Sequence, residues 1–180
     1  MKYLYMGATA EVERESFHAV RDCVAAEFAA PVQELPLPGV EFAYDGARNQ
    51  YASMAVLEML ARVCPGDALK LLAVTGHDLF IPVLTFVFGH AQLGGRVAVI
   101  SLARLRQEFY GLEPDVETLR ERACKEALHE TGHLFGLVHC GDRSCAMSLS
   151  TNIRQVDSKR AAYCGTCAAL LRRRPREQTV

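Results

Sequence analysis

The sequence predicts an α/β domain built on a mixed, mostly parallel twisted sheet that packs against helices. Three observations point to this fold class: short apolar runs alternate with stretches of helical periodicity, the runs are rich in branched residues, and glycine and proline separate them. Right-handed crossovers would join the parallel strands. The chain has 180 residues, 50% of them hydrophobic, which suffices for one core, so we expect a single compact domain over residues 1–180.

The first part of the chain contains two strand–helix units. The apolar run from Lys2 to Thr9 predicts a strand, and residues 11–30 follow with apolar side chains at helical spacing. The run from Val32 to Leu37 predicts a second strand. Residues 52–63 then predict a second helix, which ends at the Cys64-Pro65-Gly66 sequence.

Three more apolar runs and one long helix complete the expected fold. Residues 68–74, 85–88 and 97–102 predict strands. Pro114 suits a first helical position, and apolar side chains at helical spacing continue from it toward Gly136. We expect an upper part over about residues 1–136, a lower part over about 137–170 and a flexible tail over 171–180, where several arginines surround Pro175.

Charge and composition exclude several classes of partner. The net charge is −1, and no apolar stretch is long enough to cross a membrane, so we expect a monomeric cytoplasmic protein that binds neither membrane nor nucleic acid. The arginines near the end of the chain are expected to lie in solvent. Seven cysteines make an odd number, which favours metal binding over a disulfide framework.

A histidine motif carries the chemistry. His129 and His133 are four residues apart, so on a helix both imidazoles project from one face and can share a metal ion. Gly136 stands where a left-handed helix end would turn the chain back and bring His139 to the same ion. Three imidazoles leave the fourth position of a zinc ion open to water, and Glu130 can take a proton from that water. The alternative is a chance motif, and the presence of Gly136 and His139 at these fixed offsets argues against it.

Four of the cysteines have the spacing of a structural zinc site. Cys140 and Cys145 enclose four residues, and Cys164 and Cys167 enclose two. The alternative is that the four are unrelated buried side chains, as we expect for the remaining cysteines, Cys23, Cys64 and Cys124. His139 and Cys140 are adjacent, so we expect the thiolate site to fix the direction of His139.

These motifs resemble the archaemetzincin family of zinc metalloproteases, in the metzincin clan. The resemblance covers most of the chain and rests on the following segments: His129-Glu130-x-x-His133-x-x-Gly136-x-x-His139-Cys140, Cys145-Ala146-Met147, Cys164-x-x-Cys167, Phe86-Val87-Phe88-Gly89, Ser101-Leu102-Ala103-Arg104-Leu105 and Arg122-Ala123-Cys124-Lys125-Glu126. It implies a metzincin-like fold with an antiparallel edge strand, and a zinc peptidase with one catalytic and one structural Zn²⁺.

The resemblance also implies roles for residues outside the motif. Met147 would form the methionine turn beneath the catalytic zinc. The substrate peptide would pair with the edge strand formed by Thr85, Phe86, Val87, Phe88 and Gly89. His90 follows this segment and is either a substrate contact or an ordinary exposed histidine. Tyr163 is a candidate for stabilising the oxyanion only because it precedes Cys164.

Two functional hypotheses remain. The first is a zinc peptidase in which Glu130 activates a zinc-bound water, in a finer form an aminopeptidase acting on small peptides. The second is a non-catalytic binding module with two structural zinc ions. Glu130 favours the first, because a purely structural site has no use for a carboxylate beside the metal.

Overall fold

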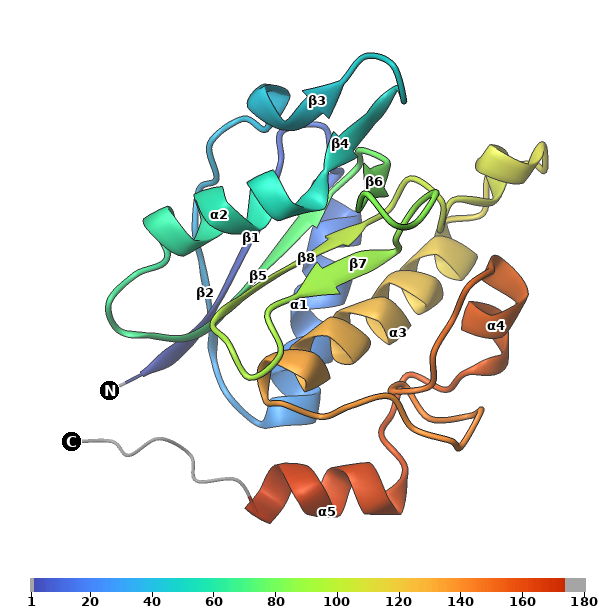
Figure 1. Ribbon diagram of the computed structural model, residues 1–180. Helices are drawn as coiled ribbons and strands as arrows, with labels where there is room; N and C mark the ends of the chain where they lie inside the picture. The colour runs from blue at the N-terminus through green and yellow to red at the C-terminus, as the bar shows by residue number, and fades with distance from the viewer. Residues whose placement is uncertain (1, 174–180) are drawn as a thin grey trace.

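The structure is a computed structural model that describes residues 2–173. Its centre is a five-stranded sheet in the order β2-β1-β5-β8-β7 (Figure 1). The strands are β1 (Tyr3–Ala8), β2 (Val32–Glu34), β5 (Ala68–Thr75), β7 (Gly89–Ala91) and β8 (Val97–Ser101). All neighbours pair in parallel except β7, which is antiparallel to β8 at one edge. The predicted fold class is therefore confirmed.

Three long helices cover the two faces of this sheet. Helix α2 (Ser53–Val63) lies on one face, and α1 (Arg14–Phe28) and α3 (Val116–Leu134) lie on the other (Figure 1). Side chains alternate along the central strands, as a buried strand requires. Leu72 and Val74 of β5 enter the core beneath α1 and α3, whereas Leu71 and Ala73 enter the core beneath α2. The sheet thus separates two hydrophobic cores.

Short elements surround this framework. A second sheet combines β3 (Tyr44–Asp45), β4 (Gln50–Ala52) and β6 (Leu79–Phe80), and two single turns of 3-10 helix span Glu41–Ala43 and Gln107–Tyr110. After α3 the chain forms α4 (Ile153–Ser158), to the right of α3 in Figure 1, and α5 (Gly165–Arg173), below it. No helix among the described residues is both long and apolar enough to span a membrane.

The segment predicted as a strand over residues 85–88 is not one. Only Val87 forms an isolated bridge, with Leu79, and the edge strand begins at Gly89. The backbone here is used by other partners, since the carbonyl oxygen of Thr85 accepts a hydrogen bond from the side chain of Gln50 and Val87 N–H donates to Leu79. These backbone groups are therefore not available for the regular hydrogen bonds of a β-strand.

Two further boundaries differ from the prediction. Pro114 is not the first helical residue, because Asp115 is the N-cap of α3 and its side chain accepts from the N–H of Thr118. Residues 171–173 are not a frayed tail but the last turn of α5, where Leu171 packs against the core. Residues 174–180 of the predicted tail lie outside the described residues.

Candidate active site

Helix α3 presents His129 and His133 on one face. The Nδ1 atom of His129 lies 2.8 Å from the carbonyl oxygen of Ala146, and that of His133 lies 2.8 Å from the carbonyl oxygen of Leu137. Because a carbonyl oxygen only accepts, each Nδ1 carries the proton and each Nε2 offers a lone pair. The two Nε2 atoms are 3.1 Å apart, and burial lowers the pKa of both rings, which favours the neutral form that binds metal.

The helix end brings the third imidazole to the same point. Gly136 has a φ of 76°, its N–H donates to His133, and the N–H of Leu137 donates to Gly132. This left-handed turn reverses the chain, as predicted from the position of Gly136. The rings of His129 and His139 stack with centroids 5.3 Å apart, and the donor atoms of the three histidines all lie within 4.8 Å of one another. Three imidazoles with converging ring nitrogens, the Nε2 atoms of His129 and His133 among them, fit a zinc ion.

Glu130 lies beside this group and is buried, with 5% of its surface exposed. It also lies under the edge strand, because a Cβ atom built on Gly89 would be 2.6 Å from Oε1 of Glu130. Burial raises the pKa of Glu130 well above its ordinary value, and the nearby carboxylate of Glu126 acts in the same direction, whereas Lys159 opposes them. Burial and Glu126 therefore favour the protonated carboxyl of Glu130, whereas Lys159 favours the ionised carboxylate.

The buried pair of Glu126 and Lys159 was missed by sequence reasoning. Glu126 Oε1 lies 3.3 Å from Lys159 Nζ, and both side chains are almost fully excluded from solvent. The spacing of four residues could have placed Glu126 on the same helix face as Glu130. No local signal marks Lys159, since its contact joins residues 33 positions apart.

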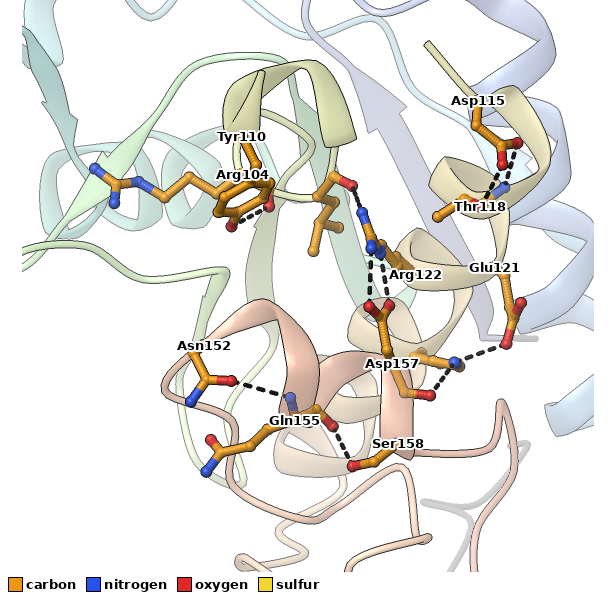
Figure 2. Close-up of polar contacts among 12 residues, drawn as sticks. Arg104, Tyr110, Asp115, Thr118, Glu121, Arg122, Asn152, Gln155, Asp157 and Ser158 are labelled. Atoms are coloured by element: carbon orange, nitrogen blue, oxygen red, sulfur yellow. Dashed lines mark hydrogen bonds and ion pairs between the residues drawn. The ribbon is translucent and has the colours of Figure 1, made fainter. Parts of the chain in front are cut away.

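A polar network fastens the segment that carries Lys159 to α3 (Figure 2). The guanidinium of Arg122 donates to both carboxylate oxygens of Asp157, at 2.6 and 2.8 Å, and also to the carbonyl oxygen of Leu105. Lys125 donates to the backbone carbonyl of Asp157. These bonds hold the end of α4 against α3. Asp157 is only two residues before Lys159, so the same bonds help to place Lys159 next to Glu126.

The segment after the helix turn packs under the histidines. Ala146 orients His129 through its carbonyl oxygen, and the N–H of Cys140 donates to Met147 O at 2.9 Å. Met147 is fully buried, and its sulfur lies so close to Gly132 that a Cβ atom there would overlap it. Glycine at 132 therefore lets methionine lie directly beneath the helix turn that carries the histidines.

Cys140, Cys145, Cys164 and Cys167 converge on one point, with donor atoms within 4.8 Å of one another. The sulfurs of Cys140 and Cys164 are 3.8 Å apart, which matches the edge of about 3.8 Å in a tetrahedron with Zn–S bonds of about 2.3 Å. The backbone N–H of Cys167 and the neighbouring thiols lower the pKa of Cys164 to about 7. Backbone N–H groups also point at the sulfurs of Cys140 and Cys145. This cluster fits a structural zinc.

A cleft of about 510 Å³ runs past the histidines and Glu130. Its lining includes Thr85, Phe86, Val87, Phe88, Gly89 and His90. The segment named in the sequence prediction thus borders the cleft, although β7 itself spans only Gly89–Ala91. Tyr163 does not face the cleft, because its hydroxyl is buried and donates to the carbonyl oxygen of Leu128.

Comparison with known proteins agrees with this geometry. Residues 32–173 match the model of peptidase family M54. The archaemetzincin of Methanocaldococcus jannaschii is 47% identical over 133 residues, which are 74% of this chain and 72% of that protein.

Two crystal structures resemble the whole fold. The archaemetzincin of Methanopyrus kandleri has a TM-score of 0.85 and 37% identity, and the match covers 96% of this chain and 94% of that one. A zinc-dependent peptidase from Methanocorpusculum labreanum has a TM-score of 0.82 and 32% identity, over 93% of this chain and 99% of that one. The chain therefore belongs to peptidase family M54, the archaemetzincins, and is a zinc metallopeptidase.

Proposed function

We propose that the chain hydrolyses peptide bonds at a zinc ion held by His129, His133 and His139, with Glu130 as the general base. The position of Glu130 carries this proposal. Its carboxylate is buried against Gly89 of the edge strand and lines the same cleft as the three histidines. A peptide lying along that edge would have its backbone next to this carboxylate, which serves no evident purpose in a purely structural metal site.

The residues divide the reaction between them. Zinc at this site would polarise the scissile carbonyl and lower the pKa of the attacking water. Glu130 accepts a proton from that water at a carboxylate oxygen and returns it to the nitrogen of the leaving amine. Lys159 favours the ionised form that the first transfer needs, and burial favours the protonated form that the second transfer needs.

The free edge of β7 is the proposed substrate-binding strand. Ser101 N–H donates to Phe88 O, and Gln92 N–H donates to Val97 O, so the hydrogen-bonded pairs with β8 fall at residues 88, 90 and 92. The N–H and C=O groups of Gly89 and Ala91 therefore point away from β8. An extended peptide can pair with these groups while its carbonyl carbon lies over the histidines.

The proposal includes a structural zinc at the four cysteines and a methionine turn at Met147. The support for the first is the 3.8 Å spacing of two sulfurs and the N–H groups directed at the thiolates. The support for the second is the packing of Met147 against Gly132. We expect two zinc ions per chain, measured by elemental mass spectrometry of protein purified with added zinc.

The decisive experiment compares the zinc-loaded parent with Glu130→Gln on a mixed-sequence peptide library, with products identified by mass spectrometry. The parent should cleave, and the variant should lose at least about 100-fold in rate while keeping both metals. Equal cleavage by the two proteins would refute the role of Glu130, and no cleavage by either would refute peptidase activity on peptides. N-acetylated copies of the cleaved peptides test the aminopeptidase form, which requires that acetylation abolish cleavage.

A further inference from the structure

His90 has a fixed orientation at the centre of the edge strand. It lies on β7 between Gly89 and Ala91, and successive side chains of a strand point to opposite faces. Gly89 faces Glu130 and α3, so His90 faces α2. There its Nδ1 lies 2.8 Å from the hydroxyl oxygen of Ser53, the first residue of α2.

Ser53 determines which nitrogen of His90 carries the proton. Its hydroxyl is fully buried and also lies 3.0 Å from the carbonyl oxygen of Phe80. A carbonyl oxygen only accepts, so the single hydroxyl proton goes to Phe80 and the hydroxyl oxygen accepts from His90 Nδ1–H. His90 Nε2 is then an unprotonated acceptor. Burial lowers the pKa of His90, which keeps the ring neutral, and no charged group contributes to that shift.

Strand pairing brings a substrate side chain to this nitrogen. The outward N–H and C=O groups belong to Gly89 and Ala91, so in an antiparallel complex the peptide residue opposite His90 occupies a non-hydrogen-bonded pair. Side chains in such pairs are on the same face and lie closest together, with Cβ atoms about 4.5–5.5 Å apart. His90 borders the cleft, so that side chain lies beside its imidazole.

We propose that His90, held by Ser53, is a specificity-determining residue that selects peptides with an uncharged hydrogen-bond donor, a hydroxyl or a carboxamide, opposite it. This inference rests on the proposed function, because it needs a peptide paired with β7. A side chain with a donor satisfies Nε2, whereas an aliphatic side chain of equal shape desolvates Nε2 without replacing its hydrogen bond to water. An ammonium is disfavoured because burial alone shifts the pKa of His90, so no carboxylate among the described residues acts on this imidazole to neutralise a bound cation.

Binding to an inactive protein tests the inference separately from catalysis. The protein is zinc-loaded Glu130→Gln, and the probes are fluorescent peptides in which one position at a time carries threonine or its isostere valine. At one position threonine should bind about 3- to 10-fold more tightly than valine. Adding His90→Phe should remove this preference, and adding the surface control His18→Phe should leave it unchanged.

The outcomes separate the two proposals. If the peptides bind without any threonine preference, or if the preference survives His90→Phe, the inference is wrong and the proposed function stands. If nothing binds and the parent cleaves nothing, both are wrong. If nothing binds although the parent cleaves, pairing with β7 is wrong and the inference fails with it.

The role of Ser53 has its own measurement. Nitrogen-15 NMR of the histidine rings should show His90 protonated at Nδ1 in the parent protein, and a mixture of both neutral forms in Ser53→Ala. The threonine preference should fall in parallel. A ring that is protonated at Nε2 in the parent would overturn the assignment of that nitrogen as an acceptor.

Discussion

Removing the charge of Lys159 tests the buried pair beneath the active site. Glu126 and Lys159 are each 3% exposed, and their charged atoms are 3.3 Å apart. At an effective dielectric constant of about 20 their attraction is about 5 kcal/mol. Lys159→Met keeps the apolar stem and leaves the Glu126 carboxylate buried without a cation, so we expect a loss of about 3–5 kcal/mol in the free energy of unfolding.

The effect should depend on pH in a defined direction. Burial raises the pKa of Glu126 above its unfolded value, and Lys159 opposes this rise. Without Lys159 the pKa of folded Glu126 rises further. A carboxyl with a raised folded pKa contributes stability that is present below the unfolded pKa and is lost as pH rises through the folded pKa. The deficit of Lys159→Met should therefore be largest at neutral pH and shrink on acidification.

Urea unfolding at pH 7 and pH 5.5, with saturating zinc, measures both effects. The control is Arg154→Met, which removes an exposed cation from α4, the helix that precedes Lys159, and should change stability by less than about 0.5 kcal/mol. The double variant Glu126→Leu/Lys159→Met removes both charges and should recover most of the loss. A loss below about 1 kcal/mol in Lys159→Met, or a double variant no more stable than the single one, would refute the reasoning.

Three further predictions concern the two metal groups and the cleft. Cys164→Ser should weaken zinc affinity at the three histidines as well as at the cysteines, and competition with a chromogenic chelator measures both affinities. Unchanged affinity at the histidines would show that the two sites are independent. Gly132→Ala should destabilise the protein by about 1–3 kcal/mol, because its methyl group would overlap Met147. Thermal unfolding measures this loss, and the control is Gly66→Ala, whose Cβ would meet nothing within 4 Å. Gly89→Ala should displace Glu130 and lower the rate of peptide cleavage by at least 10-fold with both metals retained, and a rate equal to that of Gly66→Ala would contradict the placement of Glu130.

The regular parts of the fold and the convergence of the ligands could be predicted, because their signals are local. Helical periodicity marked α1, α2 and α3, a short apolar run marked β1, and runs of branched apolar residues marked β5 and β8. The histidine and cysteine spacings predicted the two groups that the structure brings together. Gly136 predicted the turn because glycine is the residue that most readily adopts the left-handed backbone that such a turn requires.

What could not be predicted depends on contacts distant in the sequence. The apolar residues 85–88 resemble a strand, but Gln50, far upstream, takes the carbonyl of Thr85. Lys159 and the fixed tautomer of His90 likewise depend on partners from other elements. Tyr163 was proposed for the oxyanion by its proximity in sequence, and the fold turns its hydroxyl toward the carbonyl oxygen of Leu128.

The shortness of β7 limits how tightly any peptide can be held. Gly89 and Ala91 each offer one N–H and one C=O, and hydrogen bonds contribute about 0.5–1.5 kcal/mol apiece. Their sum is about 2–6 kcal/mol, which alone would give dissociation constants between about 30 mM and about 40 μM. The entropy lost on association costs about 4 kcal/mol or more and moves this range to millimolar values or weaker. Backbone pairing alone therefore cannot retain a substrate, and useful affinity must come from side chains. The same shortness gives another chain too little edge for stable strand-to-strand aggregation.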